Sequence, residues 1–184
     1  SDPRIVLLRS DAILAHGTFL ETNERQKVIG RGVEVLEAGW QKHPEATYLR
    51  RSLISALVVF GGELITNKDY QQAEIRLLRA VELCEEILKA KPDDQDGLAA
   101  CARARVNLCA AYRQMQKAPQ TREQHALAER ELERLIKLDP LDRFNIDALA
   151  TLRANGSPSR SGCCSTACKS VAAVMPPNGP TMFQ

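Results

Sequence analysis

Apolar side chains recur at steps of three and four residues along most of the chain. Leu53, Leu57, Phe60 and Leu64 form one such series, and the alternation of apolar and polar residues that marks a strand is absent from the sequence. Because residues three and four positions apart share one face of an α-helix, the pattern predicts amphipathic helices. We expect about seven of them, at residues 4–21, 24–42, 46–66, 70–90, 94–115, 121–138 and 142–153.

Three prolines divide this helical pattern at equal intervals. Pro44, Pro92 and Pro140 each follow a predicted helix, and the step from the first to the second equals the step from the second to the third. We call this step the repeat interval. Sliding the chain by one repeat interval places small residues on small ones and apolar residues on apolar ones, as with Ala56 on Ala104. Equal spacing together with this correspondence predicts a structural repeat.

Each repeat unit is predicted to be a pair of helices joined by turn residues. Asp69 is the expected N-cap of the second helix in one unit, and Thr121 to Gln124 has the pattern of a capping box in the next. A single hairpin cannot cover its own apolar face, so neighbouring units must stack. We therefore expect an all-α, right-handed superhelical array.

This array is expected to occupy residues 1–153. Its units span about 4–43, 44–91 and 92–139, with a partial unit at 140–153. Residues 154–184 contain no acidic residue and are rich in Ser, Gly, Pro and Cys, which predicts that they form no packed unit. Two explanations stay open for this segment: a disordered natural tail, or an end that is not native to the repeat.

The units resemble tetratricopeptide repeats. Leu57, Phe60, Gly61 and Leu64 follow the bulky, bulky, small, bulky pattern of the first helix in that family, and "KLDP" is similar to its typical unit end. The family's usual unit has about 34 residues, which is shorter than the repeat interval here. Long units that begin like "HPEATYLRRSL" are similar to the arrays carboxy-terminal to planctomycete-type bacterial serine/threonine kinases, although the chain has no kinase motif.

The resemblance implies a module for protein–protein interaction, with a concave groove lined by the first helix of each unit. The residues at the matching positions are Ser55, Val58, Val59, Gly62, Ile65, Arg103, Val106, Asn107, Ala110, Arg113 and Gln114. Arginine can hold a carboxylate through two hydrogen bonds, and an amide can pair with a peptide backbone. Only Asn107 matches the carboxylate clamp of the chaperone-binding members.

The implied ligand of this groove is a peptide or protein segment. Two alternatives stay open. The groove residues could form a solvated face that binds no ligand, or the array could be an oligomerisation element of a signalling or regulatory protein. In the second case the chain would self-associate through an uncapped end, since the terminal units of repeat arrays normally have a polar outer face.

Candidate chemistry is sparse in the sequence. The histidines are far apart and suggest no metal or catalytic arrangement; they are His16, His43 and His125. The helical cysteines are expected in the core and the others in the tail: Cys84, Cys101 and Cys109, then Cys163, Cys164 and Cys168. We expect no enzyme activity, no cofactor and no metal. Gly61 and Gly62 lie within a predicted helix, which favours a close helix crossing over a phosphate contact.

Charge and hydropathy narrow the class of partner. The 184 residues carry a net charge of +2, with basic and acidic side chains intermixed, so neither nucleic acid nor an anionic membrane is an expected partner. The most apolar run, residues 53–65, is shorter than the roughly 20 residues of a membrane-spanning helix. The cysteine placement does not suggest a disulfide framework, and with no evident secretion signal we expect a cytoplasmic protein.

Overall fold

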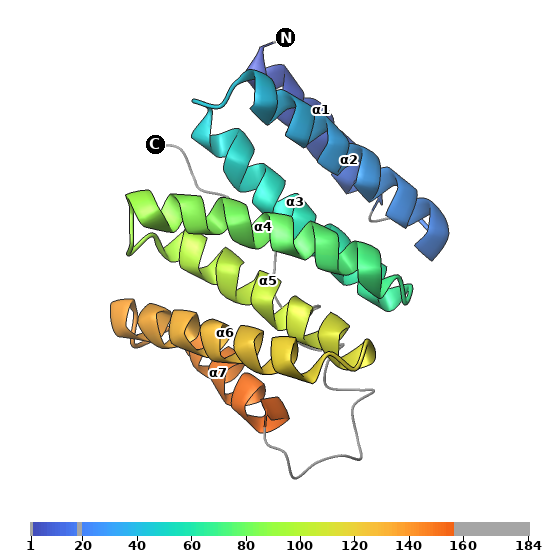
Figure 1. The fold of residues 1–184 in the computed structure, drawn as a ribbon. Helices are drawn as coiled ribbons and strands as arrows, with labels where there is room; N and C mark the ends of the chain where they lie inside the picture. The colour runs from blue at the N-terminus through green and yellow to red at the C-terminus, as the bar shows by residue number, and fades with distance from the viewer. Residues whose placement is uncertain (1, 18–19, 157–184) are drawn as a thin grey trace.

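The computed structural model describes residues 2–17 and 20–156, and these residues form a stack of seven α-helices (Figure 1). The helices are α1 (Pro3–Gly17), α2 (Thr22–Lys42), α3 (Thr47–Thr66), α4 (Tyr70–Ala90), α5 (Gln95–Gln114), α6 (Ala118–Leu138) and α7 (Arg143–Gly156). Each helix packs on its neighbours in sequence. The prediction of an all-α array of helical hairpins is confirmed.

The repeat is visible in the helix boundaries themselves. The second helices of successive units begin one repeat interval apart, and so do the first helices. The starts of α2, α4 and α6 are Thr22, Tyr70 and Ala118, and those of α3, α5 and α7 are Thr47, Gln95 and Arg143. The repeat interval read from the prolines is therefore the interval of the fold.

The prolines end the helices by restricting the residue before them. His43, Lys91 and Asp139 are the C-cap residues of α2, α4 and α6, with φ of −134°, −139° and −136°. Proline disfavours the helical conformation in the residue that precedes it, because its ring clashes with that residue's backbone. The chain therefore leaves each helix one residue before the proline.

The turn inside each hairpin also repeats. Lys68 has a left-handed φ of 64°, and Gln116, one repeat interval later, has a φ of 57°. The Asp69 N–H donates to the Leu64 carbonyl over 2.9 Å, and the equivalent bond in the next unit has the same length. The Asp69 side chain accepts a hydrogen bond from the Gln72 N–H, which confirms the predicted N-cap of α4.

Three predicted helix ends were wrong. α1 ends at Gly17 rather than at residue 21, and glycine is a common terminator of helices. α6 begins three residues before the predicted capping box of Thr121 and Gln124, because Pro119 fits the first turn of a helix, where its missing N–H costs no hydrogen bond. The Thr121 hydroxyl instead donates to the Lys117 carbonyl over 2.9 Å. α7 continues beyond residue 153 to its last residue, 156; the rest of the predicted tail lies outside the described residues.

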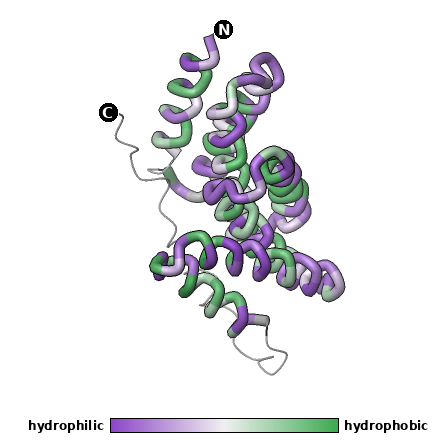
Figure 2. Tube along the Cα trace, turned by 90° about the vertical axis from the view of Figure 1, so that its left-hand side faces the viewer, coloured by the Kyte–Doolittle hydropathy of each residue, from purple (hydrophilic) through white to green (hydrophobic). Residues whose placement is uncertain are grey.

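The odd-numbered helices form one layer of the stack and the even-numbered helices the other. α3 packs on α1 and on α5, whereas the even-numbered helices pack mainly on the odd-numbered helices beside them. Each helix carries hydrophobic and hydrophilic residues along its length, as Figure 2 shows. None of the described helices combines the length and apolar character that a membrane-spanning segment requires.

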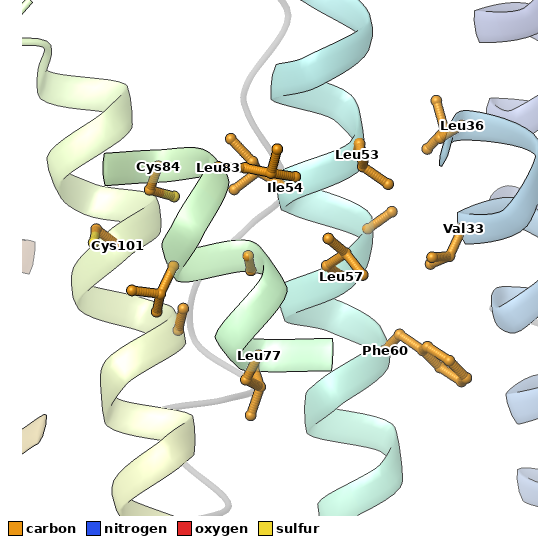
Figure 3. Packing of buried hydrophobic residues seen from close by; sticks show 14 of the residues in the cluster. Val33, Leu36, Leu53, Ile54, Leu57, Phe60, Leu77, Leu83, Cys84 and Cys101 are labelled. Carbon is orange, nitrogen blue, oxygen red and sulfur yellow. The ribbon is translucent and has the colours of Figure 1, made fainter. Parts of the chain in front are cut away.

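The core consists of two clusters of buried apolar residues: the larger extends from α1 to α5, and the smaller joins α5, α6 and α7. Figure 3 shows Leu53 and Leu57 of α3 lying between residues of α2, such as Leu36, and residues of α4. Cys84 and Cys101 are fully buried in this cluster, as predicted, and their thiols are free. The cluster is apolar, so packing of these faces supplies most of the driving force for stacking.

Gly61 permits the close approach of α3 and α4. A Cβ atom added at Gly61 would lie 2.5 Å from Cγ of Leu77, closer than real Cβ contacts allow. The neighbouring Gly62 is different, since its nearest such contact is Nδ2 of Asn107 at 3.9 Å. The predicted helix crossing is therefore confirmed for Gly61, while Gly62 borders open space.

Candidate functional site

A pocket of about 220 Å³ lies between α3, α5 and α7, the odd-numbered helices of the second, third and fourth units. We call it the central pocket. Val58 and Gly62 of α3 are four residues apart and share one face of the helix, and Val106 and Ala110 hold the equivalent positions on α5. The small residue in each pair leaves the space that the pocket occupies.

Most of the residues predicted for the groove line this pocket. The predicted residues on its wall are Val58, Val59, Gly62, Arg103, Val106, Asn107, Ala110 and Arg113. Ser55, Ile65 and Gln114 are not among the lining residues. Ile65 packs against the hydrophobic core instead, and Gln114, the last residue of α5, is exposed to solvent.

The third wall of the pocket was missed from the sequence. It consists of Ala148, Thr151, Leu152 and Asn155 of α7. The repeat carried a signal for two of them, since Thr151 and Asn155 follow Arg103 and Asn107 by one repeat interval. The partial fourth unit therefore contributes to the same surface as the complete units before it.

One edge of the central pocket is closed by an ion pair. Arg25 of α2 places Nη2 at 2.6 Å from Oε1 of Glu63 on α3, and both residues line the pocket. The two opposite charges neutralise each other locally. This pair therefore fixes the edge of the pocket without giving it a net charge.

Arg103 brings an unneutralised charge to the pocket. Its Nε donates to the Ala99 carbonyl of its own helix over 3.4 Å, and it forms no ion pair with any described residue. Burial lowers the pKa of Arg103 below its ordinary value, since desolvation disfavours the charged form. A guanidinium held in this way has hydrogen-bonding capacity left for an anionic ligand.

Arg113 joins the α5 wall to the end of the α7 wall. Its Nη2 donates to the Asn155 carbonyl over 3.1 Å. That carbonyl lies in the last turn of α7, where carbonyls lack partners within the helix and the helix dipole is negative. The contact holds the two walls together, and no carboxylate among the described residues neutralises Arg113.

The reactive side chains near the pocket do not form a catalytic arrangement. Burial raises the pKa of the Cys109 thiol to about 11, so Cys109 is protonated at neutral pH and is a poor nucleophile. His125 lies outside the pocket wall and contacts the Leu152 carbonyl through Nε2 at 2.9 Å. Within residues 2–17 and 20–156, no cluster of His, Cys, Asp and Glu side chains is suited to hold a metal ion.

The central pocket thus combines an apolar floor with polar groups from four repeat units. Comparison with protein-family models, with curated proteins and with solved structures found no match to this chain.

Proposed function

We propose that the chain is a protein-interaction module that binds a segment of a peptide or protein in the central pocket. The observation that carries this proposal is the convergence of α3, α5 and α7, from three successive repeat units, on one pocket with an apolar floor and a few polar groups. Such a combination is typical of binding sites: apolar surface supplies affinity, and the polar groups fix the orientation of the ligand.

The size and shape of the pocket favour a peptide over a cofactor. Pockets for drug-sized ligands occupy roughly 300–1,000 Å³, and the central pocket is smaller, at about 220 Å³. That volume suits one or two side chains of a ligand whose backbone continues along the surface. Val59 is 47% exposed at the pocket, so apolar surface is accessible to such a ligand.

The proposed role is binding without catalysis. The resemblance of the long repeat units to tetratricopeptide arrays supports an interaction module, and it extends the proposal to the docking region of a larger bacterial signalling protein such as a kinase. The proposed partner is a protein or peptide, with no part for nucleic acid, membrane or cofactor.

A substitution in the pocket tests the proposal. Dodecapeptides would be selected from a random phage-displayed library on the wild-type protein, and their dissociation constants measured for Val59→Asp. The control is Ile75→Asp, which changes an aliphatic residue that is 55% exposed and lies outside the central pocket. We expect Val59→Asp to weaken binding at least about tenfold, the loss of one well-packed contact, and Ile75→Asp to have little effect. Equal losses in both variants would refute the pocket as the binding site.

Exposed apolar residues at the two ends of the stack favour a second candidate function, self-association. Ile5 and Leu8 of α1 are 61% and 70% exposed, and Leu141 and Ile146 at the other end are 88% and 41% exposed. In a repeat array, terminal units normally present a polar outer face. Light scattering over a range of protein concentrations tests this function: the mass should rise with concentration, and Leu8→Glu with Ile146→Glu should abolish the rise. A constant monomer mass would refute it.

A further inference from the structure

The central pocket continues into a second pocket along the same two helices. The second pocket has a volume of about 420 Å³ and lies towards the beginnings of α5 and α7. It is lined by Gln95, Asp96, Ala99, Arg103, Leu135, Asp139, Asp142, Phe144 and Asn145. Arg103 lines both pockets, so the two form one groove with Arg103 at the junction.

The charge on the central-pocket side of this junction is positive. Arg25 and Glu63 neutralise each other, which leaves Arg103 and Arg113 as guanidinium groups without a carboxylate partner among the described residues. The floor between them is apolar and partly shielded from water. Because charge interactions are stronger where water is excluded, a carboxylate beside these guanidinium groups would be held more tightly than on an open surface.

The charge on the other side of the junction is negative. Asp96, Asp139 and Asp142 line the second pocket, and Arg103 is the cation that they share with the central pocket. Asp96 pairs with Arg51 over 3.4 Å, so Asp139 and Asp142 supply the net negative charge. These aspartates also have local structural roles. Asp142 accepts a hydrogen bond from the Phe144 N–H over 2.9 Å, for example, which caps the start of α7. Capping leaves their negative charge in place, so this half of the groove repels an anionic ligand.

The distance between the two halves sets a spacing in the ligand. Ala99 of the second pocket and Val106 of the central pocket are about seven residues apart on α5, which corresponds to about 10 Å along the helix. An extended peptide covers this length in about three residues.

We propose that the groove selects a peptide segment with an acidic residue beside an aliphatic residue, and that it rejects a second acidic residue about three positions away. The acidic side chain pairs with Arg103 while the aliphatic side chain occupies the floor formed by Val58, Val59 and Val106. A further carboxylate towards Asp139 and Asp142 is excluded by charge repulsion. This inference rests on the proposed function, since it names the class of peptide that the central pocket takes.

The test compares the peptides selected by charge variants of the groove. The same random phage-displayed dodecapeptide library would be selected on the wild type, on Arg103→Gln, and on Asp139→Asn, whose amide oxygen can still accept the Leu141 N–H. The control is Arg130→Gln, which removes an exposed arginine of α6 that lines neither pocket. Circular dichroism would verify that each variant is helical.

The outcomes separate this inference from the proposed function. We expect selection on the wild type to enrich peptides with an acidic residue next to an aliphatic one. Arg103→Gln should lose this preference for an acidic residue. It should also bind the peptides selected on the wild type about tenfold more weakly, which is the scale of one charged hydrogen bond. Asp139→Asn should accept a second acidic residue, and Arg130→Gln should behave as wild type. The inference alone would be overturned if the binding of the selected peptides depends on Val59 but the peptides show no preference for an acidic residue. It would also be overturned if Arg103→Gln leaves their binding unchanged. Peptides that do not depend on Val59 would overturn the proposed function as well.

Discussion

The buried Arg105 allows the sharpest quantitative prediction. Its side chain joins three helices: Nε lies 2.8 Å from Oε1 of Glu131, Nη1 lies 2.8 Å from Oε1 of Gln124, and Nη2 lies 2.6 Å from Oε1 of Glu85. Arg105 is only 4% exposed and Glu131 only 9%. A guanidinium and a carboxylate are therefore paired inside the core, where the Glu131 carboxylate takes its counter-charge from Arg105.

The repeat provides a single variant and a matched double variant. The preceding unit fills the same two positions with leucines, because Leu57 and Leu83 lie one repeat interval before Arg105 and Glu131 and are themselves buried. Arg105→Leu leaves the Glu131 carboxylate buried without its counter-charge, which should lower the free energy of unfolding by about 3–5 kcal/mol. Arg105→Leu with Glu131→Leu removes both charges and restores the residue types of the preceding unit. Its remaining losses are the hydrogen bond to Gln124 and the ion pair with the half-exposed Glu85, so its free energy of unfolding should lie within about 1–2 kcal/mol of the wild type.

The pH dependence of the single variant gives an independent check. Burial raises the pKa of Glu131 above its ordinary value of 4.5, against the opposing effect of Arg105. Removing Arg105 should raise this pKa further. An acid whose pKa is higher in the folded state loses stabilisation as the pH rises from its ordinary value through its folded value. The deficit of Arg105→Leu should therefore be smaller at about pH 5 than at about pH 8, where the unfolded chain alone gains from ionisation.

Urea denaturation followed by circular dichroism at both pH values measures these free energies. The reasoning is refuted if the double variant is as unstable as the single variant, since the loss would then come from packing rather than from the unpaired charge. A deficit that does not vary with pH would likewise show that Glu131 is not the group left uncompensated.

Three further predictions concern the backbone and the caps. Gly61→Ala should lower the free energy of unfolding by about 1–3 kcal/mol, because the added Cβ would lie 2.5 Å from the Leu77 side chain. Gly62→Ala, whose Cβ would lie 3.9 Å from its nearest neighbour, should instead raise the free energy of unfolding by up to about 1 kcal/mol through better helix propensity. Thermal melts that show equal effects of the two substitutions would contradict this. Lys68→Gly should stabilise the hairpin turn by up to about 1 kcal/mol in urea denaturation, because a φ of 64° is strained for lysine, and a loss of stability would contradict that reason. The hydrogen bond from Arg51 lowers the pKa of Asp94 below its ordinary value of 3.8. The wild type should therefore be more stable than Asp94→Asn above pH 3.8, and this advantage should disappear as the pH falls through the pKa of Asp94 in the folded state. An advantage that persists in stronger acid would exclude this ionic contribution.

Some residues of the central pocket could be predicted from the sequence, and others could not. Val58, Val106 and Asn107 were placed on one surface because they match the groove positions of the tetratricopeptide repeats that the units resemble, and all three line the central pocket. Asn155 was missed because the array was predicted to end at residue 153. Gln114, the last residue of α5, was also assigned to the groove but does not line the central pocket.

Local signals were misleading where they competed with the repeat. The capping-box pattern at Thr121 suggested a late start for α6, yet adding the repeat interval to Tyr70 gives the observed start at Ala118. Pro119 agrees with this earlier start, because proline fits the first turn of a helix.

The sequence by itself determined the helical content, the length of the repeat unit, the proline stops and the apolar faces that drive stacking. All of these depend on neighbours a few residues away, or on the same short pattern returning at a fixed interval. Only the tertiary structure decided that α7 closes the central pocket, that Arg103 lies at the junction of two pockets of opposite charge, and that Arg105 finds partners on two other helices. These features depend on the distances and angles between packed helices, which are set by side-chain volumes at contacts far apart in the chain.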